Sequence, residues 1–182
     1  MKRKKILSLI AFSLFCFCSK KEEKPNYRYF EFSYDNTFET SFSIKFKPND
    51  SIYIREHWNG KTIWDSISPP REKTNYIAVI SQQQRKVLNY LISKIQLKQC
   101  DSIYYENYVD GRTYSIFIDK DSIKKLINVH SHNNVPHELD SLAAWLYNFK
   151  SKAKLIEINK KLNFITAKYV LPPPPPPPPI KK

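Results

Sequence analysis

The chain has 182 residues, of which 41% are hydrophobic, 14% aromatic and 26% charged, as is typical of one folded domain with short extensions. Only 2 residues are glycine, which excludes the glycine-rich phosphate cradles of dinucleotide-binding folds and P-loops. The basic residues that give the formal net charge of +13 are scattered among acidic ones without a nucleic-acid-binding signature, so we expect no nucleic-acid partner.

The first 17 residues have the pattern of a secretion signal. Basic residues follow Met1, and an apolar run extends from Ile6 to Phe17. A membrane span needs roughly 20 apolar residues, and this run is shorter. The run stops at Cys18, and the charged segment Ser19–Lys24 comes next.

This pattern resembles the signal peptides of bacterial lipoproteins, and the charged segment is similar to the export tether of surface lipoproteins in Bacteroidota. The resemblance implies that residues 1–17 are removed, that Cys18 carries the diacylglyceryl and palmitoyl groups, and that residues 18–26 form a lipidated tether. The expected location is the cell envelope, with a membrane anchor. Cys16 could instead be the acceptor, but processing there would leave the apolar Phe17 in the tether. The pattern is also compatible with a soluble secreted chain or with an uncleaved anchor.

Residues 27–170 are predicted to form the folded domain, which starts with two strands. We expect Tyr27–Tyr34 and Phe38–Phe46 to pair through a turn at Asp35-Asn36. Every second residue of the second segment, from Phe38 to Phe46, is apolar or Thr, which indicates a strand with one buried face.

Two further hairpins are predicted from favoured turn dipeptides. Asn59-Gly60 would join strands at Ser51–His57 and Lys61–Ser66. Asp110-Gly111 would join strands at Ser102–Tyr108 and Arg112–Ile118 in the same way. We also expect strands at Tyr76–Ile80, Asp121–His130 and Phe164–Val170.

Two helices are predicted. The first begins at Ser81, which forms a capping box with Gln84. Its buried stripe is Val87, Leu88, Leu91, Ile92 and Ile95, and its outer side is Arg85, Lys86, Asn89, Ser93 and Lys94. The second begins at Pro136 and buries Leu139, Leu142, Ala143, Leu146 and Phe149. The expected fold is therefore α+β, an antiparallel sheet built from hairpins with two helices packed on one face.

A histidine cluster is the first candidate site. His130, His132 and His137 fall within eight residues and could together hold Zn²⁺, with Glu138 acting as a base on bound water. None of the established zinc signatures is present, so the competing interpretation is a solvated polar loop. We identify no catalytic residue otherwise, because Cys100 has no nucleophile signature around it and is typical of a small buried residue.

Aromatic residues on the predicted hairpins are the second candidate site. Trp58, Trp64, Tyr104 and Tyr105 could stack on sugars or bury in a protein partner. The competing interpretation is that such rings pair across strands and stabilise the hairpins themselves.

Residues 171–182 form a tail that contains an uninterrupted run of prolines, Pro172–Pro179. Such a run adopts polyproline II and serves either as a ligand for an aromatic groove or as a spacer. We expect a lipid-anchored envelope protein that binds another envelope protein or a glycan without catalysis. Two further hypotheses are a metal-dependent envelope hydrolase that uses the histidine cluster and an immunity-type or inhibitor protein.

Overall fold

The structure is a computed structural model that describes residues 23–36, 39–47, 51–59, 74–108 and 111–171. Its eight-stranded sheet has the order β5-β7-β6-β1-β2-β3-β4-β8. The strands are β1 (Tyr29–Asn36), β2 (Thr40–Phe46), β3 (Ser51–Asn59), β4 (Thr74–Val79), β5 (Ile103–Tyr105), β6 (Arg112–Lys120), β7 (Ile123–His130) and β8 (Ile156–Glu157). Strands and helices occur in one unit, so the predicted α+β class is confirmed.

Both predicted helices are present. Helix α2 (Gln82–Lys94) has the expected capping box, in which the Gln84 N–H donates to Ser81 Oγ over 3.2 Å and the Ser81 N–H donates to Gln84 Oε1 over 2.9 Å. Helix α3 (His137–Lys152) begins one residue after Pro136. All five apolar residues predicted for its inner side are buried.

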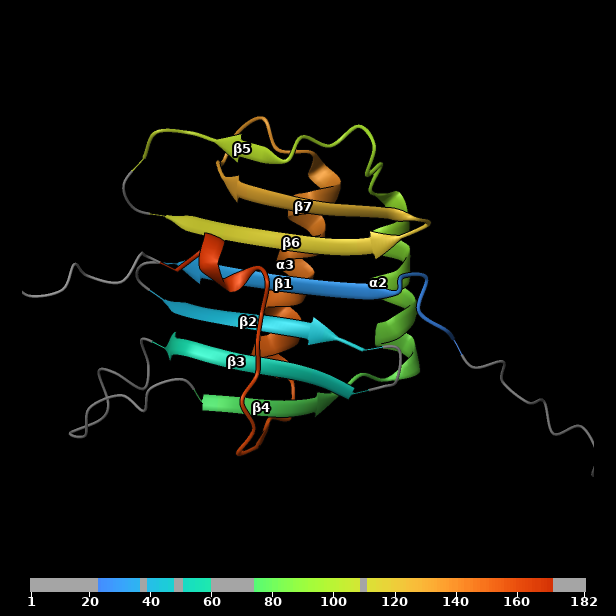
Figure 1. The fold of residues 1–182 in the computed structure, drawn as a ribbon, viewed down its shortest axis with the longest axis vertical. Helices are drawn as coiled ribbons and strands as arrows, with labels where there is room; N and C mark the ends of the chain where they lie inside the picture. Colours follow the sequence, from blue (N-terminus) through green and yellow to red (C-terminus); the bar gives the residue numbers. More distant parts are fainter. Residues whose placement is uncertain (1–22, 37–38, 48–50, 60–73, 109–110, 172–182) are drawn as a thin grey trace, which may run out of the picture.

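The sheet has a layer on each side. Figure 1 shows α2 and α3 behind the sheet, and the chain that follows α3 crossing in front of it. The apolar core includes Phe32, Ile44 and Ile116 of the sheet together with Ile92 of α2 and Leu142 of α3. We call the segment 158–171 the C-terminal strap; it includes the short 3₁₀ helix η1 (Ala167–Tyr169).

The strap corrects two predictions. The strand expected at Phe164–Val170 is absent, because the N–H and hydroxyl of Thr166 both donate to the Glu31 carboxylate instead of joining a strand ladder. The expectation that the second strand has one buried face was also wrong. Ser41 and Ser43 lie on the side opposite the apolar core residues and are nevertheless fully buried.

One predicted hairpin was wrong, and the sheet is not built from antiparallel pairs alone. Strand β5 pairs in parallel with β7, with Tyr104 opposite Val129. The hairpin partner of β6 is β7, joined through Asp121 and Ser122, whose φ angles are 49° and 65°. Two consecutive left-handed residues form the tight turn that suits a hairpin. Because β6 lies between β1 and β7, β5 adds to the outer edge of β7.

The outer side predicted for α2 was partly wrong. Arg85 and Asn89 are only 2% and 6% exposed. The N-terminal segment 23–28 covers Asn89, because Asn89 Nδ2 donates to the carbonyl of Lys24 over 2.8 Å and Asn26 Nδ2 donates to the carbonyl of Asn89 over 2.8 Å. Tyr27 of the same segment interacts with Arg85. Part of the predicted tether therefore packs on the domain.

The remaining expectations divide into two groups. Asp35 and Asn36 were expected in a turn, but they pair with Ser41 and Thr40 and so extend β1. The predicted leader, the strand Lys61–Ser66 and the proline tail lie outside the described residues.

Candidate functional site

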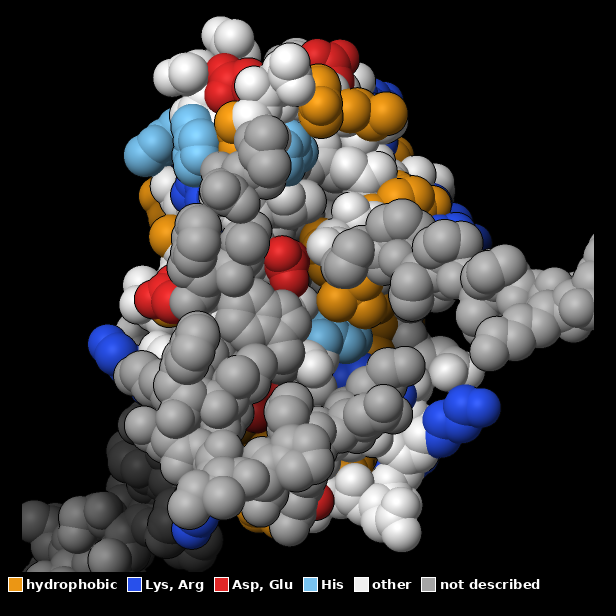
Figure 2. Space-filling view, turned by 90° about the vertical axis from the view of Figure 1, so that its left-hand side faces the viewer, with side chains coloured by type: hydrophobic (Ala, Val, Ile, Leu, Met, Phe, Trp, Pro, Cys, Tyr) orange, Lys and Arg blue, Asp and Glu red, His pale blue; other side chains and the backbone are white. Residues whose placement is uncertain are grey.

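Two tyrosines and two histidines form a continuous stack of rings at one end of the sheet. The order is Tyr105, His130, Tyr108 and His132, with centroid separations of 5.4, 4.1 and 4.8 Å. We call these four residues the ring stack. Figure 2 shows histidine side chains gathered near the top of this end of the molecule, where β5 and β7 finish.

The hydrogen bonds of His130 leave no ring nitrogen free for a metal. Nε2 donates to the carbonyl of Tyr108 over 3.0 Å, because a carbonyl oxygen can only accept. Nδ1 lies 2.7 Å from the hydroxyl of Thr113. His130 is thus held as a structural ring between two tyrosines.

The other two histidines of the proposed zinc cluster have separate surroundings. The ring of His132 stacks on Tyr108, whereas His137 lies in the first turn of α3, with Nε2 3.2 Å from Ser141 Oγ. Among the described residues, no three His, Cys, Asp or Glu side chains form a group suited to a metal ion. The geometry therefore supports neither the zinc hypothesis nor the role as a base that it gave to Glu138.

Glu106, the residue after β5, binds the loop that carries His132. Its carboxylate accepts the N–H of His132 over 2.9 Å and the N–H of Asn133 over 3.4 Å. These bonds, above all that from His132, hold the pKa of the Glu106 carboxyl below its ordinary value.

Gly111 gives Tyr108 its place in the ring stack. Its φ of 149° is unfavourable for other residues, and a Cβ there would lie 2.7 Å from Cε2 of Tyr108. The ring therefore packs directly over the backbone at the start of β6. The glycine of the dipeptide that suggested a hairpin therefore permits this close approach.

The predicted aromatic surface is divided by the sheet. Tyr105 is 67% exposed and lies beside the equally exposed Ile103 in β5, since alternate residues of a strand point to the same side. Tyr104 points to the other side, packs against the apolar core and accepts the N–H of Asp101 over 2.9 Å. Trp58 belongs to β3, away from β5 in the sheet order, and Trp64 lies outside the described residues.

A polar row beneath the strap was missed by the sequence analysis. Side by side across neighbouring strands lie Asn128, Ser115, Ser33, Ser43, Arg55 and Asn75. Ser33 Oγ lies 2.5 Å from Ser43 Oγ and 2.6 Å from Thr166 Oγ1. The only signal in the sequence is that polar residues alternate with apolar ones in the two paired strands β1 and β2.

Ser43 also lies 2.9 Å from Nε2 of His57, the extra residue of a β-bulge in β3. A serine beside a histidine is the first requirement of nucleophilic catalysis. Ser43 is fully buried, however, and its hydroxyl is shared with Ser33, so a substrate cannot reach it. The polar row therefore holds the strap in place and does not form an active site.

The carboxylate of Glu31 completes this buried layer. It accepts two hydrogen bonds from Thr166 and one from the hydroxyl of Tyr29, and Lys45 Nζ lies 3.5 Å away. Lys45 and Arg55 also donate to carbonyl groups of the strap. Burying Glu31 is tolerated because its oxygens are paired in this way.

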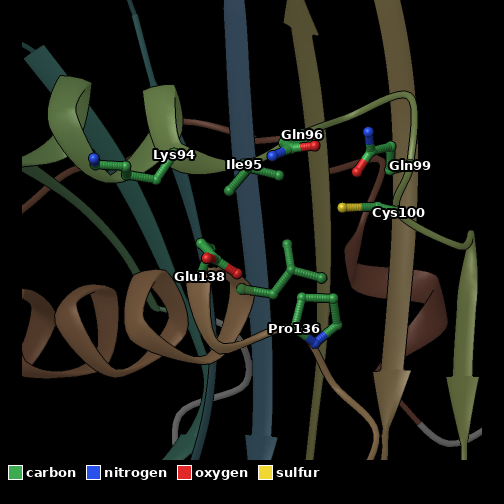
Figure 3. Close-up of a pocket in the computed structure, with 8 residues that line it drawn as sticks. Lys94, Ile95, Gln96, Gln99, Cys100, Pro136 and Glu138 are labelled. Atoms are coloured by element: carbon green, nitrogen blue, oxygen red, sulfur yellow. The ribbon is translucent and has the colours of Figure 1, made fainter.

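A pocket of about 240 Å³ lies between the end of α2 and the start of α3 (Figure 3). Cys100 lines it together with polar residues that include Gln99 and Glu138. Burial raises the pKa of the Cys100 thiol, which disfavours the thiolate required of a nucleophile. The expectation that Cys100 is buried is confirmed, at 8% exposure.

Comparison with protein-family models and with characterised proteins gives no match for this sequence. None of the described helices has the length and apolar character needed to cross a bilayer.

Proposed function

We propose that this chain is a lipid-anchored protein of the cell envelope whose domain binds another envelope protein through strand β5 and performs no reaction. The anchor is Cys18, on the strength of the basic and apolar leader that precedes it. The binding surface is the exposed side of β5, and the observation that carries this assignment is the 67% exposure of both Ile103 and Tyr105.

The backbone of β5 favours a protein over a glycan as the partner. Ser102 O and Glu106 N are hydrogen-bonded to β7, so the alternating backbone groups of Ile103 and Tyr105 point away from the sheet. A partner strand can pair with such groups while its side chains meet the two apolar residues. The ring stack holds Tyr105 in place and so reduces the entropy lost on binding.

We propose that the domain performs no reaction because each of the candidate side chains that could act as a nucleophile or base is hydrogen-bonded, buried or has an unfavourable pKa. His130 has both nitrogens engaged, Cys100 has a raised pKa and Ser43 is inaccessible. Each of these groups has a structural role that accounts for its position.

The anchor is tested by feeding cells labelled palmitate. We expect the wild-type chain to be labelled and to be found in the membrane fraction. We expect the Cys18→Ala variant to carry no label. Label retained by Cys18→Ala, or none in the wild type, would refute the assignment of Cys18.

The binding surface is tested by placing a photo-crosslinking amino acid at position 105 of the full chain in cells. We expect a discrete protein adduct whose yield falls about tenfold with Ile103→Lys, because a charged edge residue opposes strand pairing. Val79→Lys is the matched control, since Val79 is 71% exposed on another strand. No adduct, or equal losses with both variants, would refute β5 as the surface.

A further inference from the structure

Helix α2 has a basic exposed side that the proposed function does not use. Lys86, Tyr90 and Lys94 are spaced four apart and therefore lie on one side of the helix, and Lys98 lies in the turn that comes after the helix has ended. All four are exposed, Tyr90 by 59%, and residues 81–100 contain no Asp or Glu. We call these four residues the α2 basic surface.

The ring of Tyr90 belongs to the same surface. The Lys94 ammonium lies 5.1 Å from the centre of this ring. Tyrosine between lysines is the combination that suits the boundary between water and a bilayer, where the ring contacts acyl groups and the ammonium groups contact phosphates.

The acidic groups nearest to this surface are few. Glu23 lies beside Asn89, where it accepts from Nδ2 over 3.3 Å. Asp101 follows the helix, and Glu138 lines the pocket that Lys94 also lines. None of these three lies within residues 81–100, and when Arg85 and Lys24 are counted with the three lysines, five described basic residues lie around α2 against three acidic ones.

The N-terminal segment brings the proposed anchor to the same helix. Residues Lys24 and Asn26 are hydrogen-bonded to Asn89, in the middle of α2. Figure 1 shows the first described residues running beside α2 before β1 begins. Cys18 is five residues before Glu23, and an extended chain spans at most about 3.6 Å per residue, so Cys18 lies within about 18 Å of Glu23.

We infer that the α2 basic surface rests on a bilayer that contains anionic phospholipid. This inference rests on the proposed lipid anchor, because acyl groups at Cys18 would hold Glu23, which is hydrogen-bonded to Asn89 of α2, within about 18 Å of the anchored residue. The several acyl chains expected at Cys18 suffice to anchor the chain, so the α2 basic surface would determine which side of the domain faces the phosphate groups.

The test uses the mature chain, residues 18–182, made without acyl groups and with Cys18→Ala, which keeps every described residue. Its binding is measured by sedimentation with vesicles of phosphatidylcholine and with vesicles that also contain phosphatidylglycerol. We expect binding only to the second kind, and weaker binding as salt is raised. Circular dichroism and thermal unfolding verify that each variant is folded.

The decisive variant replaces Lys86, Lys94 and Lys98 with Gln. Each lysine near an anionic surface contributes enough attraction that the partition coefficient should fall roughly 100-fold for the three together. The matched control replaces Lys152, Lys154 and Lys161 with Gln, which removes the same charge from exposed lysines of other elements. We expect the control to change binding less than about threefold, since only nearby charges act within the screening length.

Three results would overturn the inference. They are no binding to anionic vesicles, equal losses with the two triple variants, and binding that a soluble anionic polysaccharide matches without vesicles. The last result would identify a polysaccharide as the partner. Palmitate labelling reports on the anchor alone and vesicle binding on the α2 basic surface alone, so failure of one proposal is distinguishable from failure of the other.

Discussion

Thr166 is the strap residue whose side chain and N–H are both hydrogen-bonded to the polar side of the sheet. Its hydroxyl lies 2.9 Å from Glu31 Oε1 and 2.6 Å from Ser33 Oγ, and its side chain is fully buried. We predict that Thr166→Val, which keeps the shape but removes the hydroxyl, lowers the free energy of unfolding by about 1–2 kcal/mol. Urea denaturation measures the loss.

Thr166→Ser is the control for this prediction, because it keeps the hydroxyl and removes only a methyl group. Its loss should be smaller than that of Thr166→Val. If the serine variant is the less stable of the two, packing and not hydrogen bonding holds the strap.

Glu106 gives a prediction that depends on pH. Its pKa is lowered in the folded state, chiefly by the His132 N–H, so its contribution to stability is present above the unfolded pKa of about 4.3 and is lost as pH falls through the lower folded pKa. The stability advantage of the wild type over Glu106→Gln should therefore shrink on acidification below about pH 4. Urea denaturation over a pH series measures this, and an advantage that stays constant would contradict it.

Among the elements, α2 was the most predictable from sequence, because its capping box and apolar stripe are local patterns. We predict that Ser81→Ala lowers the free energy of unfolding by about 1 kcal/mol, since the Gln84 N–H loses its acceptor. Ser93→Ala, an exposed position in the same helix, is the control and should cost little, because alanine favours helix. Thermal unfolding compares them, and equal losses would show that the cap contributes nothing specific.

The predictions that were wrong concern features that depend on contacts between distant segments of the chain. The helical spacing predicts that Asn89 is exposed to solvent. It is buried because the segment around Asn26, 63 residues earlier, packs on it. The parallel position of β5 follows from the turn at Asp121 and Ser122, which lacks the glycine that usually marks such turns.

The candidate site was predicted only in part for the same reason. The sequence shows that these four residues are tyrosines and histidines, but the order in which their rings stack depends on β5 lying beside β7. The polar row could not be predicted, because polar residues at alternate positions are also the pattern of a solvent-exposed side of a strand. Its burial comes from the strap, more than 100 residues later, through contacts such as that between Ser33 and Thr166.

At the scale of the whole molecule, the segment 23–28, which leads to β1, and the proposed binding surface lie at opposite ends of the sheet. Tyr29, where β1 begins, is opposite Asp119, close to the turn between β6 and β7. Tyr105 is opposite His130, at the far end of β7. Eight residues of strand separate these ends by about 26 Å.

We therefore predict that position 105 stays clear of the bilayer while α2 contacts it. A fluorophore attached to Ser93→Cys should be quenched by lipids that carry a quencher near the phosphates, when the acylated chain is bound to anionic vesicles. A fluorophore on Tyr105→Cys should keep most of its emission, because about 26 Å of sheet separates it from the anchored end. Cys100→Ala in both variants removes the remaining domain thiol. Equal quenching at the two positions would mean that the sheet lies flat on the bilayer, with β5 unavailable to a partner.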